Sequence, residues 1–246
     1  MDFGLQLYSV RDFSEKDFKD TLRRVAEIGY KKVEAAGFYG YEPKEIREWA
    51  DELGIEFCSA HCGFDMLDED FNGAVAAMKA LGCAYYTVPW AFWLKPEFMD
   101  ENIAKINKYQ PMLEAEGIIM QFHSHRDEFL DVEGRVAIDE MYNKTKILLQ
   151  VDTFWAYAAG KDPIEVLKKY GDRIKTIHLK DGVCKKSENG EDDVEGRPLG
   201  CGDAPVSRVV AYARENGLLP IVESENLNPD GITEVTNCYK FLEGIN

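Results

Sequence analysis

Short apolar runs alternate with longer charged segments along the whole chain. The charged segments, such as EPKEIREWADEL and DPIEVLKKYGD, have helical periodicity, and the apolar runs predict eight strands, at 3–8, 31–36, 55–61, 84–89, 118–124, 147–152, 174–179 and 219–224. A helix between successive strands makes neighbouring strands parallel. Eight such units in 246 residues predict a closed (β/α)8 TIM barrel, a single domain over residues 1–246, rather than an open doubly wound sheet.

Glycine marks the return from helix to strand at five places. A charged amphipathic segment ends and an apolar run begins at Gly29, Gly54, Gly82, Gly117 and Gly217. Glycine takes the left-handed conformation after a helix without steric cost. These positions therefore support the predicted element boundaries.

All four histidines lie at or near the downstream ends of predicted strands. They are His61, His123, His125 and His178, and Asp152 and Glu223 hold equivalent positions. The C-terminal ends of barrel strands surround one pocket. The sequence therefore predicts a single polar site assembled from distant parts of the chain.

Charge and composition limit the partners. A formal net charge of -16 opposes binding to phosphate backbones, so we expect no nucleic-acid partner. We expect no signal peptide and no membrane span, because the strand-like FGLQLYSV starts at once and no apolar run approaches about 20 residues. Six cysteines without a CxxC pair indicate reduced thiols in a cytoplasmic protein. The sequence does not decide whether the protein forms a homo-oligomer.

Three strand-end residues have the chemistry of a metal site. Asp152, His178 and Glu223 follow the sixth, seventh and eighth predicted strands, and two carboxylates with an imidazole suit one divalent ion, Mn, Mg, Co or Zn. Other interpretations exist for two of them. Asp152 can cap the following helix, and His178 can be a core histidine hydrogen-bonded to a neighbour.

The chain resembles a known family in several segments: LQLYSVRD, VAEIGYKKVEAAGFYG, FHSHRDEF, VDTFWAYAAGKDP, RIKTIHLKDG and IVESE. They are similar to those of the xylose isomerase-like barrels of the sugar phosphate isomerase/epimerase family, relatives of ketose 3-epimerases and inosose dehydratase. The resemblance runs from about residue 4 to the last strand. It implies a TIM barrel that binds one divalent metal through a strand-five residue, Asp152, His178 and Glu223.

Strand five departs from the pattern of the family. Its epimerases have a glutamate there that binds the metal and moves a proton, whereas this chain has His123. Alternation along the strand directs His123 and His125 to the barrel interior and Ser124 away from it. His123 can still bind a metal or support a ligand. The two-carboxylate proton relay, however, loses one member.

These residues predict an isomerase or epimerase that acts on a sugar, keto-sugar or polyol through an enediolate. Glu223 would be the base, and His125 or Lys180 would handle the second proton. Loss of a β-substituent would instead make the enzyme a dehydratase or lyase. A barrel that binds sugar without catalysis is a further alternative, and repair of abasic DNA is disfavoured by the acidic charge.

Several residues are candidates for contacts with a small carbohydrate substrate: Glu34, His61, Trp90, Trp155 and Glu225. Glu34 can instead form a salt bridge across the rim, His61 a structural hydrogen bond, and the tryptophans, with Trp93, can fill the core. The absence of a Gly-rich cradle or an Arg cluster favours a substrate without phosphate. The polar segment DGVCKKSENGEDDVEGRPLGCGDAP predicts a long loop, either a lid or a solvated insertion.

Overall fold

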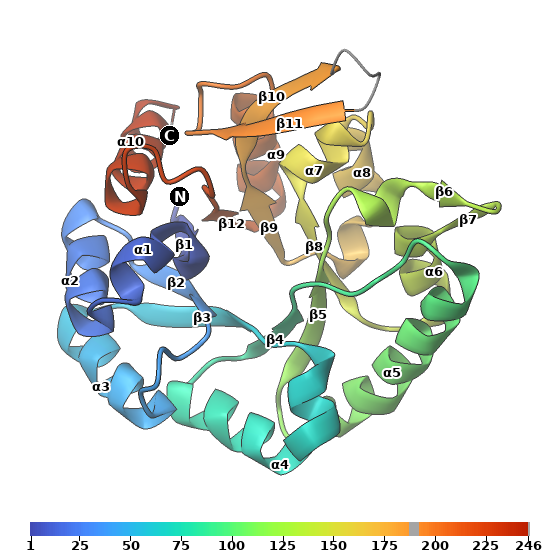
Figure 1. The fold of residues 1–246 in the computed structure, drawn as a ribbon, viewed down its shortest axis with the longest axis horizontal. Coiled ribbons are helices and arrows are strands. Elements are labelled where there is room, and N and C mark those ends of the chain that lie inside the picture. The colour runs from blue at the N-terminus through green and yellow to red at the C-terminus, as the bar shows by residue number, and fades with distance from the viewer. Residues whose placement is uncertain (187–191, 246) are drawn as a thin grey trace.

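Eight parallel strands close into a barrel in the computed structural model, which describes residues 1–186 and 192–245 (Figure 1). In chain order they are β1 (Gly4–Gln6), β2 (Lys32–Ala36), β3 (Glu56–His61), β4 (Tyr85–Val88), β5 (Ile119–His123), β8 (Leu148–Asp152), β9 (Thr176–Leu179) and β12 (Leu219–Val222). The first and last strands pair with each other, which closes the ring. The predicted TIM barrel and all eight predicted strands are confirmed, with ends trimmed by a few residues.

Helices surround the barrel (Figure 1). They are α2 (Phe18–Ile28), α3 (Pro43–Leu53), α4 (Phe64–Leu81), α5 (Pro96–Ala115), α6 (Ala137–Lys144), α8 (Pro163–Lys169), α9 (Val206–Asn216) and α10 (Gly231–Ile245). Shorter helices lie in the connections: η1 (Leu7–Val10), α1 (Arg11–Ser14), η2 (Asp127–Phe129), α7 (Thr153–Ala158) and η3 (Gly171–Arg173). Gly54 and Gly217 end α3 and α9 with φ of 67° and 65°, as the glycine pattern predicts.

The barrel interior beneath the C-terminal strand ends is polar. Its buried polar side chains are Gln6, Glu34, Ser59, Thr87, Gln121, Gln150 and Thr176. They satisfy one another: Gln121 Nε2 donates to Thr87 Oγ1 at 2.7 Å, and Gln150 Nε2 donates to Glu34 Oε2 at 2.7 Å. Such a bonded layer fixes the side chains above it, whereas the apolar core lies between the strands and the helices.

The predicted long loop after the seventh barrel strand contains a hairpin over part of its length. β10 (Asp181–Lys186) and β11 (Asp192–Arg197) pair as an antiparallel hairpin, which lies at the periphery of the view in Figure 1. Residues 187–191, within the same predicted loop, lie outside the described residues. A second small hairpin, β6 (Asp131–Val132) with β7 (Arg135–Val136), follows η2.

The described ranges contain no helix with the length and apolar character that a bilayer crossing requires. Within those ranges Cys58, Cys62, Cys83, Cys201 and Cys238 form no disulfide, and all of these except Cys201 are buried.

Candidate active site

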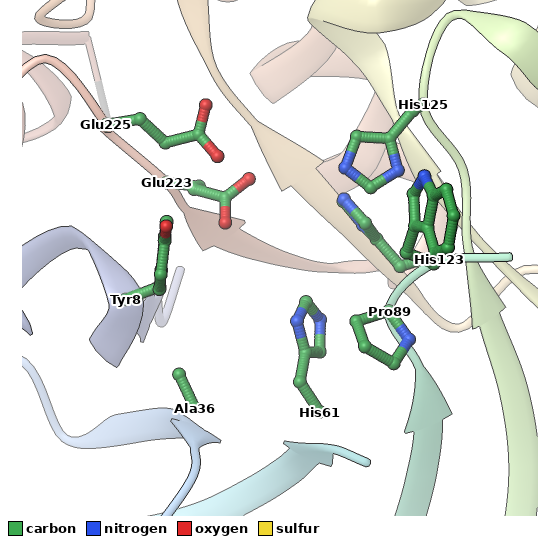
Figure 2. Close-up of a pocket in the computed structure, with 9 residues that line it drawn as sticks. Tyr8, Ala36, His61, Pro89, His123, His125, Glu223 and Glu225 are labelled. Atoms are coloured by element: carbon green, nitrogen blue, oxygen red, sulfur yellow. The ribbon is translucent and has the colours of Figure 1, made fainter. Parts of the chain in front are cut away.

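A cavity of about 380 Å³ opens at the C-terminal ends of the barrel strands (Figure 2). Its lining residues come from both ends of the chain: Tyr8, Ala36, His61, Pro89, Trp90, His123, His125, Glu223 and Glu225. A cavity therefore lies where the sequence predicted the site. Five predicted site residues are not part of this lining: Glu34, Asp152, Trp155, His178 and Lys180.

Four side chains converge at the floor of the cavity: His123, Asp152, His178 and Glu223 offer ligand atoms that all lie within 4.8 Å of one another. All four side chains are buried. Two of their atoms, His123 Nδ1 and Asp152 Oδ2, have no hydrogen-bond partner. Buried polar atoms normally have one. Two carboxylates and two imidazoles with free positions suit a divalent transition-metal ion, so the residues fit the predicted metal.

Asp152 uses its two carboxylate oxygens differently. Oδ1 accepts hydrogen bonds from the backbone N–H groups of Phe154 at 2.8 Å and Trp155 at 2.9 Å, which caps α7. Oδ2 has no partner. Burial raises the pKa of Asp152 to about 7, although Lys180 and His178 oppose the rise. The two interpretations of Asp152 are therefore compatible, because a capping carboxylate keeps one oxygen for a cation.

His178 lies between two carboxylates. Its Nε2 is 2.7 Å from Glu34 Oε1, and its Nδ1 is 3.3 Å from Glu223 Oε2. Burial would lower the pKa of His178, but these two carboxylates outweigh it and raise the pKa to about 10. The ring orientation is thereby fixed from both sides.

Glu34 lies below the cavity floor and not at the rim. Its side chain has no exposed surface. Besides His178 it contacts Gln6 Nε2 at 2.7 Å and His61 Nε2 at 2.8 Å. Burial would raise the pKa of Glu34, but the His61 and His178 imidazoles hold it well below the ordinary value. The structure thus places Glu34 in ion pairs with His61 and His178 beneath the cavity, which is the salt-bridge alternative in the interior and not at the rim, and its substrate contact stays a prediction.

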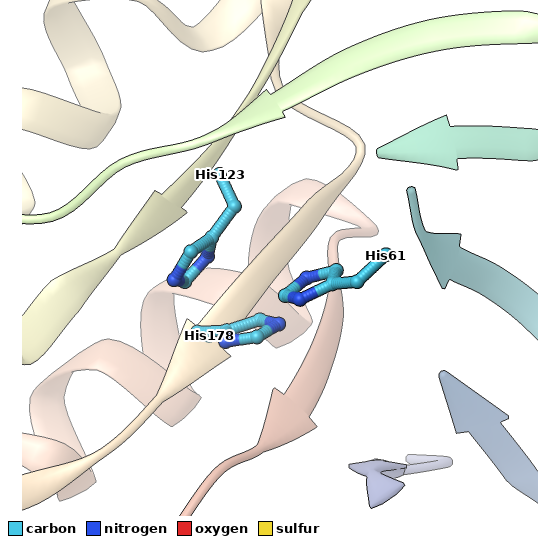
Figure 3. Close-up of side chains that lie close together, drawn as sticks. All are labelled: His61, His123 and His178. Atoms are coloured by element: carbon cyan, nitrogen blue, oxygen red, sulfur yellow. The ribbon is translucent and has the colours of Figure 1, made fainter. Parts of the chain in front are cut away.

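Three histidines gather above Glu34, and a fourth borders the cavity. The rings of His61, His123 and His178 lie close together (Figure 3), and the His123 ring centroid is 4.3 Å from that of His178. His61 is bonded below to Glu34 and lines the cavity above, with 11% of its side chain exposed. Burial lowers the pKa of His123 well below its ordinary value and the pKa of His125 to about 4. Both rings are therefore neutral at pH 7.

Lys180 is a buried ammonium behind the cavity wall. Its Nζ contacts a carboxylate oxygen of Glu225, is 3.8 Å from Glu223 Oε2, and lies 4.8 Å from the centre of the Trp155 ring. Burial would raise the pKa of Glu223, but Lys180 and His178 lower it to about 2. The positive charge of Lys180 is thus paired with the carboxylates of Glu223 and Glu225.

The tryptophans separate into different environments. Trp90 lines the cavity and is 60% exposed. Trp155 is half-buried behind Lys180, so its ring contacts the ammonium. Trp93, for which filling the core was the stated alternative, is 1% exposed and packs edge-on against Phe122 in the core. The sequence of the WAFW segment did not show that Trp90 is exposed and Trp93 is buried.

Two kinds of residue were missed by the sequence interpretation. Tyr8 lines the cavity directly after β1, where an aromatic residue after the first strand was the available signal. Gln6 and Gln150 hold Glu34 and His61 in place. The signal for them was a polar residue at the centre of an apolar strand, which is costly unless it is hydrogen-bonded.

Comparisons with known proteins identify the family and the fold of the chain. Residues 22–236 match the family model described as xylose isomerase-like TIM barrel. An inosose dehydratase from Geobacillus kaustophilus (strain HTA426) is 24% identical over 186 residues, which cover 65% of this chain and 60% of that protein. Other similar proteins carry the same name. The chain spans 60 to 64% of the length of the first curated relatives that it matches.

Solved structures share the fold along the whole chain. A sugar phosphate isomerase/epimerase from Parabacteroides distasonis ATCC 8503 superposes with a TM-score of 0.82 at 22% identity, covering 98% of this chain and 97% of that one. The IOLI protein with a binding zinc atom superposes with a TM-score of 0.79 at 15% identity, covering 100% and 98%. At these identities the likeness concerns the fold.

Proposed function

Because this chain belongs to the xylose isomerase-like TIM barrel family, we propose that it is a metal-dependent dehydratase acting on an uncharged keto-sugar or keto-polyol. The observation that carries this proposal is the pair of unlike groups facing the cavity. Glu223, a carboxylate, and His125, a neutral imidazole, lie on opposite walls (Figure 2). Elimination of water needs a base at one carbon and a hydrogen-bond donor at the next.

The floor cluster would hold one divalent ion through His123, Asp152, His178 and Glu223. Support comes from the unpartnered His123 Nδ1 and Asp152 Oδ2 and from the zinc described for the IOLI protein. Such an ion supplies Lewis-acid polarisation of a substrate carbonyl and its neighbouring hydroxyl. Glu34 would support the site from below, because a carboxylate bonded to the far nitrogen of a ligand histidine fixes its orientation.

The side chains of the cavity would carry the protons. Glu223 removes the proton from the carbon beside the carbonyl, and the electrons of that C–H bond move into the enediolate. The C–O bond at the next carbon then breaks. The hydroxyl leaves as water with the proton that Glu223 removed, while the N–H of the neutral His125 imidazole would hydrogen-bond to the departing oxygen.

The lining favours a substrate without phosphate. None of the nine lining residues is Lys or Arg, and two of them are carboxylates. Lys180 is engaged by Glu225. A phosphate group would meet no cationic partner in this lining, whereas hydroxyl groups would find His61, Tyr8 and Glu225 as partners and Trp90 as an apolar wall.

An isomerase or epimerase, the first choice from the sequence, is the second candidate. His125 faces Glu223 across the cavity, which would let it return the proton to the other face of the same carbon. The name of the superposed sugar phosphate isomerase/epimerase also favours this activity. The relatives named inosose dehydratase and the missing strand-five glutamate favour dehydration.

Proton NMR in D₂O separates the candidates. The purified protein, with its metal content measured, is incubated with Mn²⁺ and a keto-inositol or keto-hexose. A dehydratase produces a dehydrated ketone with new ultraviolet absorbance, and an isomerase or epimerase inserts deuterium beside the carbonyl without loss of water. Glu223→Gln should abolish either reaction, while Glu27→Gln on the exposed face of α2 should not. Sugar binding without either product would leave only the non-catalytic barrel.

A further inference from the structure

The segment that carries two cavity carboxylates leaves the sheet immediately. The β1 ladder reaches β12 only as far as Val222, and the Glu223 N–H donates to the Leu179 carbonyl at 3.0 Å as the last strand contact. From Ser224 to Asp230 the chain is irregular, and α10 begins at Gly231. Glu223 and Glu225 therefore need other contacts to hold them in place.

Those contacts come from residues 9–12, part of the LYSVRD segment. Ser9 Oγ accepts a hydrogen bond from the Ser224 N–H at 3.0 Å, and the two residues are 215 positions apart in the chain. Arg11 Nη2 donates to the Glu225 carbonyl at 3.0 Å. A third contact joins Asp12 Oδ2 to the N–H of the first residue of α10, at 3.2 Å. The three contacts follow one another along the same segment.

Arg11 also joins two walls of the cavity. Its Nη1 donates to the Tyr8 carbonyl at 2.8 Å, and its guanidinium lies 4.1 Å from the centre of the Tyr8 ring. Tyr8 and Glu225 both line the cavity. The planar guanidinium offers several donors in fixed directions, so one side chain can set both positions.

Residues 9–12 pack closely against the start of α10. A Cβ at Gly231 would lie 2.3 Å from the Ser9 carbonyl oxygen and 2.9 Å from Val10 Cα. On the other side, Glu234 Oε2 accepts hydrogen bonds from Ser224 Oγ at 3.0 Å and from the Leu227 N–H at 2.9 Å. Ser224 is thus held between β1's continuation and α10.

We propose that residues 9–12 form a clamp that positions Glu223 and Glu225, with Ser9 and Arg11 as its positioning residues. The function of the clamp rests on the proposed activity, whereas its existence does not. Supporting contacts behind metal ligands and catalytic groups commonly change affinity or activity by about 10- to 100-fold when removed. The clamp ties the two strand ends that meet where the barrel closes.

The test uses the full chain with Ser9→Ala, Arg11→Gln and Gly231→Ala. The controls are Thr145→Ala, a buried threonine at the end of α6 whose Oγ1 donates to the Met141 carbonyl, and Arg23→Gln on the outer face of α2. Hydrogen exchange is followed for residues 223–231, the Mn²⁺ dissociation constant by calorimetry, and kcat and KM in the reaction found for the unmodified protein. Thermal unfolding checks that each variant is folded.

We expect faster exchange in residues 223–231, Mn²⁺ binding weakened about 10-fold, and a kcat lowered by about 10- to 100-fold with a smaller change in KM. The controls should stay within about twofold, as expected away from the supporting contacts. Unchanged exchange in folded Ser9→Ala and Arg11→Gln would overturn the clamp. Changed exchange with unchanged metal affinity and kcat would overturn its positioning role.

Failure of the proposed function is distinguishable from failure of the clamp. If the unmodified protein neither binds Mn²⁺ nor turns over a keto-polyol, the proposed function fails, and the exchange experiment still decides the clamp. If Arg11→Gln does not fold, Ser9→Ala and Arg11→Lys decide. Ser9→Ala removes one hydrogen-bond acceptor, and Arg11→Lys replaces the guanidinium by an ammonium without adding volume.

Discussion

The buried carboxylates of the site differ in what their two oxygens do. Asp152 caps α7 with Oδ1 and leaves Oδ2 free beside His178 and Glu223, whereas Glu34 has both oxygens occupied by protein donors. The same side-chain chemistry would thus give a ligand of the proposed metal in one place and a support in the other. The number of satisfied oxygens, not residue type, separates the two roles.

Glu34→Gln tests the support. An amide would put an N–H donor among the donors that now surround Glu34 and would remove the charge behind His178. We expect Mn²⁺ binding weakened by about 10- to 100-fold, measured by calorimetry. Glu56→Gln, an exposed glutamate of β3, is the control. Equal affinity in Glu34→Gln and the unmodified protein would disprove the support.

Glu128 should make stability depend on pH. It is 1% exposed, its Oε2 accepts the His125 N–H at 2.7 Å, and burial raises its pKa to about 8 from 4.5. Between these values the folded state keeps a proton that the unfolded state loses. The contribution of Glu128 to the free energy of unfolding is therefore complete below about pH 4.5. It falls by about 1.4 kcal/mol per pH unit as the pH rises toward 8.

Glu128→Gln should remove that slope and keep an oxygen for the His125 N–H. The measurement is the free energy of unfolding in urea at several pH values, with exposed Glu45→Gln on α3 as control. A parallel pH dependence of Glu128→Gln and the unmodified protein would refute the assignment.

At the scale of elements, one carboxylate organises the base of the β10–β11 hairpin. Asp181 Oδ1 accepts the N–H groups of Gly182 at 2.8 Å and Ala204 at 3.1 Å, and Oδ2 accepts those of Gly200 at 2.9 Å and Gly202 at 3.0 Å. These four hydrogen bonds hold the two ends of a polar, glycine-rich segment together. Composition indicated a loop because three of these four contacts join residues 19 to 23 positions apart.

Asp181→Asn should loosen this hairpin. The amide nitrogen would face two N–H donors, so two hydrogen bonds to a charged acceptor are lost, and we expect a free energy of unfolding lower by at least about 2 kcal/mol. Urea denaturation and hydrogen exchange of residues 182–186 and 194–204 are the measurements. Asp203→Asn, an exposed neighbour, is the control. An unchanged midpoint with unchanged exchange would contradict the role of Asp181.

At the scale of the molecule, the floor cluster links metal binding to stability. Its ligand atoms come from β5, β8, β9 and the end of β12, which are brought together by closure of the barrel. An ion held there binds the folded state in preference to the unfolded chain. The whole barrel should therefore respond to metal removal.

Mn²⁺ at about 100 times its dissociation constant should stabilise the protein by about 2.7 kcal/mol, and a chelator should reverse the gain. The measurement is thermal unfolding with and without metal. The double variant Asp152→Asn with Glu223→Gln should gain much less. The same gain in the double variant would place the ion elsewhere.

The sequence by itself determined the barrel and the face that carries the site. Periodicity of apolar residues and glycine at helix ends are local signals, and in a β/α barrel every strand end reaches the same face, so His123, Asp152, His178 and Glu223 could be grouped from their positions alone. Depth, partners and orientation are not local properties.

Only the tertiary structure decided that Glu34 lies under the histidines, that Trp93 is in the core while Trp90 is exposed, and that residues 9–12 hold the chain after β12. These facts depend on which side chains from distant strands meet and which oxygens they satisfy. Such contacts span up to 219 positions, and no local pattern of apolar and polar residues encodes them.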